Sequence, residues 1–138
     1  MKQKIVGSYS LGNESVQLVA REGTGGDYYT QPEKAHIARI KVGMDYKASA
    51  WEEVVNALLH ESLELSIDRH NARHRPTNDI SYDHSNYIFV FNHPQFSDIV
   101  AKTAEFITPA LPDLARTFKA WHKKPAKKKP SKSKKSKQ

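Results

Sequence analysis

The sequence predicts an α+β protein in which a small N-terminal antiparallel sheet packs on a central helix and is followed by C-terminal helices. Apolar and polar residues alternate over 4–11, 15–21 and 35–42, as in strands with one buried face. Residues 50–74 carry a long helical pattern, and two further helical patterns, 94–107 and 109–121, each begin at a proline. With 138 residues, 38% of them hydrophobic, the chain suits one domain with a modest core, which we assign to residues 1–122.

The segments between the expected strands differ in character. Gly12-Asn13 tolerates the positive φ of a tight turn, so the first two strands should form a hairpin. The glycine-rich segment 22–27 lacks the Lys-Ser/Thr pair of a phosphate-binding loop and opens no helix, so we expect a connector. A polar loop over 76–86 should lead into a short aromatic strand at 87–91.

Polar residues mark both ends of the central helix. Ser49 and Glu52 have the spacing of a capping box, which predicts that the helix begins there. Basic side chains near its other end suit the negative end of the helix dipole. Arg75-Pro76 would end the helix after His74, because the residue before a proline avoids helical backbone angles.

Prolines mark the expected C-terminal helices. Asn92 or His93 would cap the first of them, with Pro94 in its first helical position. Thr108-Pro109 repeats this arrangement before the second. The second helix carries an apolar face that we assign to the core, formed by Leu111, Leu114, Phe118 and Trp121.

The central helix contains the sequence His60-Glu61-Ser62-Leu63-Glu64. Residues four apart share a helix face with Cβ atoms about 6 Å apart, so His60 and Glu64 can bind one metal ion with Glu61 beside them. In the zincin motif His-Glu-x-x-His, two imidazoles bind zinc and the glutamate acts as general base toward water. Carboxylate oxygen is also a zinc ligand. The motif therefore predicts a divalent metal, zinc first, on His60 and Glu64, with Glu61 as catalytic base.

A solvated helix surface is the alternative interpretation, because His and Glu are ordinary residues there. Against it, the helix is apolar around most of its circumference, as in a buried helix whose polar side chains need partners. The pattern favours a site, either active or vestigial. The apolar residues are Val54, Val55, Leu58, Leu59, Leu63, Leu65 and Ile67.

A catalytic zinc ion takes three protein ligands, so a third donor is needed. We expect His93, because a side chain at the junction of a strand and a helix is held rigidly. Asp68 and His84 remain open, and a helix cap or a hydrogen-bonded core histidine is the alternative for His93. We expect His70 and His74 to cap the helix dipole, since added positive charge is unfavourable beside the neighbouring arginines.

The order of hairpin, strand, motif-bearing helix and C-terminal helices resembles small zincin-like proteins of phages and prophages. The resemblance covers about residues 5–122 and is carried by Leu-Leu-His-Glu at 58–61, Phe-Asn-His-Pro-Gln-Phe at 91–96 and Ala-Leu-Pro-Asp-Leu at 110–114. It implies a minimal metallopeptidase-like fold without a defined substrate. The chain departs from the family motif at Glu64, and a more anionic ligand set lowers the Lewis acidity of the ion and can select another metal.

The charge is distributed unevenly along the chain. The net charge is +7, yet nine of the 22 basic residues and none of the 15 acidic ones lie in 123–138, so residues 1–122 carry −2. We expect this tail to be disordered, because it has too little apolar surface to bury. Its lysines would bind nucleic acid or another polyanion, or only keep the protein soluble. They are Lys123, Lys124, Lys127, Lys128, Lys129, Lys132, Lys134, Lys135 and Lys137.

The chain has no cysteine, so His, Asp and Glu must bind any metal. Its first seven residues lack the apolar core of a signal peptide, and no apolar run approaches the roughly 18 residues that span a bilayer. We expect a cytoplasmic protein that makes no membrane contact. It would be a metal-dependent hydrolase, or a non-enzymatic phage or prophage accessory protein with a degenerate metal site.

Overall fold

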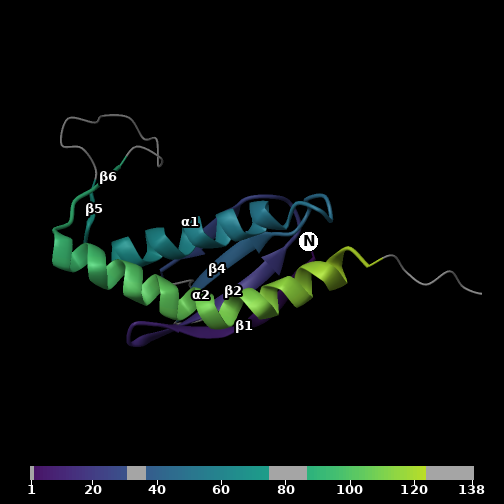
Figure 1. Ribbon diagram of the computed structural model, residues 1–138, viewed down its shortest axis with the longest axis horizontal. Helices are drawn as coiled ribbons and strands as arrows, with labels where there is room; N and C mark the ends of the chain where they lie inside the picture. Colours follow the sequence, from purple (N-terminus) through teal and green to yellow (C-terminus); the bar gives the residue numbers. More distant parts are fainter. Residues whose placement is uncertain (1, 31–36, 75–86, 124–138) are drawn as a thin grey trace, which may run out of the picture.

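The computed structural model describes residues 2–30, 37–74 and 87–123, and it confirms the α+β class. Both helices lie against one face of a four-stranded sheet, α1 over β3 and β4 and α2 mainly over β1 (Figure 1). The elements in chain order are β1 (Gln3–Leu11), β2 (Glu14–Arg21), β3 (Gly26–Tyr29), β4 (Ala38–Gly43), α1 (Trp51–Arg69), β5 (Arg73–His74), β6 (Ile88–Phe89) and α2 (His93–Trp121).

The main sheet is mixed, not antiparallel as expected, and its strand order is β1-β2-β4-β3. β1 and β2 form the expected hairpin, with Gly12 at a φ of 64°. β3 then reverses the chain, so β4 pairs antiparallel with β3 and parallel with β2. The expected connector 22–27 therefore ends early, because Gly26 and Asp27 already belong to an edge strand.

Apolar side chains that alternate along the strands fill the space between the sheet and the helices. From the sheet, the fully buried ones include Val16, Leu18, Ile40 and Val42. From the helices they include Val54, Leu58, Leu65, Phe106 and Leu114. The sequence pattern thus identifies the buried face of β2, β4 and α2. It does not do so for α1, which the pattern predicts to be buried on most sides but which exposes Leu59.

The central helix α1 is shorter than the expected 50–74 and begins without the expected capping box. Its N-cap is Ala50, and no side chain caps the first turn, so Ser49 does not play that role. It ends at Arg69, because Asn71 adopts left-handed backbone with a φ of 53° and turns the chain into β5. His74 consequently lies in a strand and not on the helix.

The two expected C-terminal helices are one continuous helix, α2. Asn92 caps it as expected and exchanges capping hydrogen bonds with Gln95. Pro109 and Pro112 lie inside the helix, where each proline typically costs about 3 kcal/mol. Buried side chains on both sides of the prolines offset this cost, which explains why the helix continues. They are Ile99, Thr103, Phe106, Ala110, Leu114, Thr117 and Phe118.

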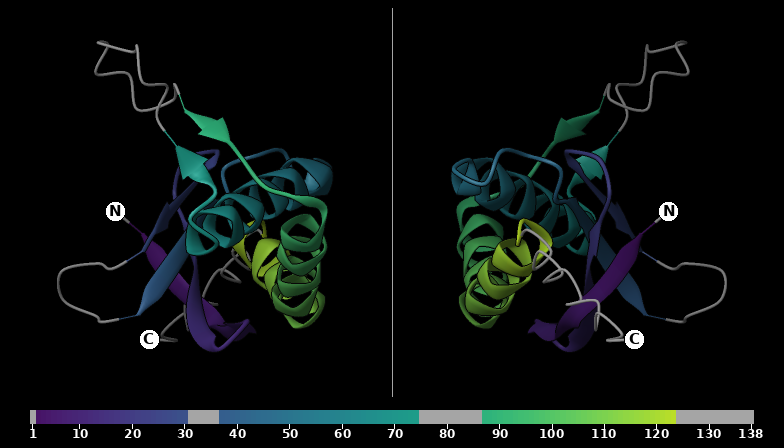
Figure 2. Two further views of the ribbon diagram at one scale, coloured as in Figure 1. Left: turned by 90° about the vertical axis from the view of Figure 1, so that its left-hand side faces the viewer. Right: turned by 90° about the vertical axis from the view of Figure 1, so that its right-hand side faces the viewer.

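β5 and β6 form a separate two-stranded sheet that projects beyond the two layers (Figure 2). The expected loop 76–86, the residues His84 and Ala35, and the tail beyond Lys123 lie outside the described residues. What the sequence indicates about these residues stays a prediction. Within the part of the chain that the structure describes, neither helix is long and apolar enough to cross a membrane.

Candidate metal centre

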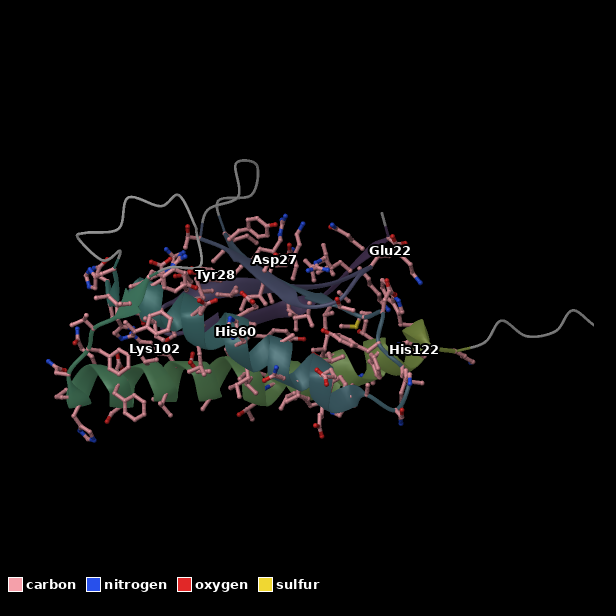
Figure 3. The ribbon with its side chains drawn as sticks, turned by 90° about the horizontal axis from the view of Figure 1, so that it is seen from above. Glu22, Asp27, Tyr28, His60, Lys102 and His122 are labelled. Atoms are coloured by element: carbon pink, nitrogen blue, oxygen red, sulfur yellow. The ribbon has the colours of Figure 1, made fainter. Side chains whose placement is uncertain are left out.

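One face of α1 brings His60, Glu61 and Glu64 together, and their potential ligand atoms all lie within 4.8 Å of one another. Nε2 of His60 is 3.1 Å from Oε2 of Glu64 and 4.0 Å from Oε1 of Glu61. Figure 3 labels His60 on α1 and Asp27 and Tyr28 on β3, the strand that α1 contacts. The helical spacing therefore produces a group that could hold a metal ion.

The two carboxylates of this group are buried, whereas the imidazole is exposed. Glu61 and Glu64 are 7% and 9% exposed, and the side chain of His60 is 63% exposed. A solvated helix face therefore does not describe the two glutamates. Glu64 contacts His60 and also accepts a hydrogen bond from the hydroxyl of Tyr87. Both contacts are expected, because a buried polar group needs partners.

Burial raises the pKa of Glu61 from 4.5 to about 7. His60 opposes this change, the negative charges of Glu64 and Asp27 add to it, and Arg21 opposes it weakly. A carboxyl with a pKa near neutrality both accepts and returns a proton at physiological pH. Glu61 therefore has the protonation behaviour of a general acid or base.

Gly26 in β3 makes room for the side chain of Glu61. It pairs with Val42, whose buried side chain points toward the helices, so Gly26 faces α1 as well. A Cβ atom at Gly26 would lie 2.7 Å from Cγ of Glu61. No residue with a side chain fits there unless Glu61 moves.

The group borders a groove of about 730 Å³ between α1, β3 and the β5–β6 unit. This volume lies in the range that binds a small molecule or a short peptide. Glu61 and Glu64 both line the groove, so their oxygens face a space that a substrate can enter. The other lining residues are 26–30, Asp68, Arg73 and Tyr87.

The structure does not bring the expected third ligand, His93, into this group. His93 is the exposed first residue of α2, and its ring packs against an aromatic neighbour in the same helix. Asp68 lines the groove without joining the group. His70 caps the end of α1 and pairs with Asp98 at 2.6 Å. Among the described residues, the third member of the group is Glu61.

The donor atoms suit a divalent metal. An imidazole nitrogen and carboxylate oxygens are ligands for zinc and for other divalent ions such as Mn²⁺. Two donors at about 2.0–2.1 Å from one tetrahedral ion lie about 3.4 Å apart. The 3.1 Å between His60 and Glu64 is close to that separation, so the residues fit such an ion.

Sequence patterns did not point to Tyr28, Arg73 and Tyr87, although all three line the groove. Their positions depend on strand pairing, which brings residues distant in sequence to one end of α1. The only local signal is the tyrosine content of 28–29 and 87. Tyrosine is common in strands, so this signal does not indicate a site.

In comparison with known proteins, the chain matches no protein-family model, no curated protein and no solved structure.

We expect Glu61→Gln to stabilise the metal-free protein above about pH 7 and to have little effect near pH 4. The folded state holds the Glu61 proton more tightly than the unfolded state, so stability falls as the pH rises from about 4.5 to about 7, and an amide shows no such fall. Since one pKa unit corresponds to about 1.4 kcal/mol, a shift from 4.5 to about 7 limits the gain to roughly 3 to 4 kcal/mol. Urea unfolding in EDTA across this pH range measures it.

Glu53→Gln, an exposed position on the same helix, is the matched control and should change stability little at any pH. A gain for Glu61→Gln that does not vary with pH would contradict the raised pKa.

Proposed function

We propose that this protein is a zincin-like, metal-dependent hydrolase in which His60 and Glu64 bind a divalent ion, most simply zinc. Of the candidates for the third ligand that a catalytic zinc ion takes, His84 lies outside the described residues and stays a prediction. The supporting observation is the His60-Glu61-Glu64 group with its two buried carboxylates on the wall of a groove. Neighbouring buried carboxylates destabilise each other when both are ionised, and a bound cation removes that cost. A costly arrangement of this kind beside a groove is typical of functional sites.

Each residue of the group has a separate role in the proposed reaction. When bound, the ion supplies Lewis acidity toward a substrate carbonyl and lowers the pKa of water. His60 Nε2 and a carboxylate oxygen of Glu64 provide its electron pairs. Glu61 takes a proton from the attacking water and delivers it to the leaving amine, as a group with a pKa near 7 can do in both directions.

A short peptide is the substrate class that this proposal favours. The resemblance to zincin-like proteins points to amide hydrolysis, and the groove has a volume suited to a short peptide.

Zinc-loaded protein should retain about one equivalent of metal after unbound ion is removed, and His60→Ala should retain none. The reason is that His60 is the single imidazole of the group. Metal analysis of the two proteins by mass spectrometry gives the answer. His93→Ala, which removes an exposed imidazole outside the group, is the matched control and should retain the metal. Metal retained by His60→Ala, or no metal in the wild type, would contradict the proposed metal site. Loss of metal from His93→Ala would show that His93 is a ligand after all.

Glu61→Gln should keep the metal but lose turnover by a factor of about 100 to 10,000, because the amide keeps the shape of glutamate and cannot accept a proton. Cleavage of a peptide library, followed by mass spectrometry, measures turnover. Asp68→Asn, at a carboxylate of α1 that lines the groove outside the His60-Glu61-Glu64 group, is the control. Equal turnover in the wild type and in Glu61→Gln would remove Glu61 as the base.

We propose separately that the lysine-rich tail binds nucleic acid or another polyanion. If the protein is a non-enzymatic accessory protein, this binding would be its main activity. The supporting observation is the contrast between the nine lysines of 123–138 and the net charge of −2 in residues 1–122. Lys123 is exposed where α2 ends, and the other eight lysines lie outside the described residues.

Removing residues 123–138 should abolish binding to DNA duplexes and leave folding and metal content intact, because the tail supplies all of the net positive charge. Binding of the full chain should fall steeply with salt and should not depend on sequence. Titration of labelled duplexes with both proteins tests this, and a full-length variant with the nine lysines changed to glutamine controls for tail length. Undiminished binding by the shortened chain would place the contacts on the folded domain.

A further inference from the structure

The two oxygens of Glu64 have different partners. Oε2 lies 3.1 Å from Nε2 of His60, and Oε1 accepts a hydrogen bond from the hydroxyl of Tyr87. Tyr87 thus occupies one oxygen of the carboxylate and leaves the other directed at the imidazole. Glu64 is held in a single orientation by a residue outside the His60-Glu61-Glu64 group.

Arg73 in turn holds Tyr87. Its guanidinium lies 3.9 Å from the centroid of the Tyr87 ring, and its Nη1 donates a hydrogen bond of 2.6 Å to the hydroxyl of Tyr28. The strand pairing explains this contact, because Arg73 lies opposite Phe89 in the β5–β6 ladder. Tyr87 is two residues before Phe89 and therefore on the same face, diagonal to Arg73.

These contacts connect the His60-Glu61-Glu64 group with β5–β6, a sheet that is separate from the main one. An isolated two-stranded sheet is at best marginally stable, and β5–β6 projects from the rest of the molecule (Figure 2). Arg73 ties this unit to β3 through Tyr28, and Tyr87 ties it to α1 through Glu64. The same side chains thus attach the β5–β6 unit and fix a proposed metal ligand.

From this arrangement we infer that Tyr87 is a positioning residue for the metal site, which orients Glu64 toward His60, and that Arg73 acts through Tyr87. The inference rests on the proposed metal site and extends it to residues outside the ligand group. Hydrogen bonds to ligand side chains typically change metal affinity or activity by 10- to 100-fold. Tyr87 therefore affects metal affinity without a bond to the ion.

The zinc affinity of Tyr87→Phe, measured by competition with a chromophoric chelator, tests the role of the hydroxyl. We expect binding about 10- to 100-fold weaker than in the wild type. Tyr29→Phe is the matched control, because Tyr29 lines the same groove and its hydroxyl makes no hydrogen bond to Glu64 in the described structure. Its affinity should equal that of the wild type.

A purely structural role for Tyr87 predicts a different result. In that case Tyr87→Phe lowers the urea midpoint of the metal-free protein, and the folded protein binds zinc with unchanged affinity. Unchanged affinity would overturn the positioning role.

Arg73→Met tests whether Arg73 acts through Tyr87, since methionine keeps an apolar chain beside the ring and removes the cation and the donor. We expect weaker zinc binding, and no further loss when Arg73→Met is added to Tyr87→Phe, because the hydroxyl that Arg73 positions is already gone. Additive losses would overturn this part of the inference.

The experiments distinguish a failure of the positioning role from a failure of the metal site itself. If the wild type binds zinc, His60→Ala does not and Tyr87→Phe binds as the wild type does, only the positioning role is overturned. If the wild type binds no zinc, both are overturned.

Discussion

The placement of two carboxylates away from water, one helical turn apart on α1, is the constraint on which the site depends. Burying an ionised carboxylate costs several kcal/mol unless a partner offsets its charge. The carboxyl group can also avoid this cost by keeping its proton. The chain meets this cost differently at the two positions. Burial raises the pKa of Glu61 to about 7, so the proton is retained more readily, whereas Glu64 remains between His60 and the Tyr87 hydroxyl. Gly26 supplies the space that makes the first arrangement possible.

The half-buried character of the motif follows from where α1 lies on the sheet. α1 covers β4 and the short edge strand β3, so its buried side reaches the margin of the sheet. Leu58 and Leu65 on this helix belong to the core, whereas Glu61 and Glu64 open into the groove beyond that margin. One helix thereby contributes both to folding and to the candidate site, which is why a strongly apolar helix contains polar residues at defined positions.

Local patterns in the sequence predict the features that depend on local physics. Alternation gives the first two strands, helical spacing brings His60 and Glu64 together, and Asn92 caps α2. The missed features depend on tertiary contacts. The strand at 26–29 begins with Gly-Asp, which is typical of a loop, and its edge position becomes clear only once β4 pairs with it. Packing on both sides of Pro109 outweighs the local helix-breaking signal. Whether His93 could meet the motif depends on how α2 packs, which spacing along the chain does not specify.

The link between the metal group and β5–β6 has a thermodynamic consequence. Any effect of the Tyr87 hydrogen bond on metal affinity must be matched by an equal effect of the metal on that hydrogen bond, because coupling between two binding events is reciprocal. A 10- to 100-fold effect on affinity corresponds to about 1.4–2.7 kcal/mol. This amount is significant for a two-stranded sheet that is marginal by itself. An ion that binds between His60 and Glu64 would therefore also stabilise β5–β6, at the edge of the groove that a substrate enters.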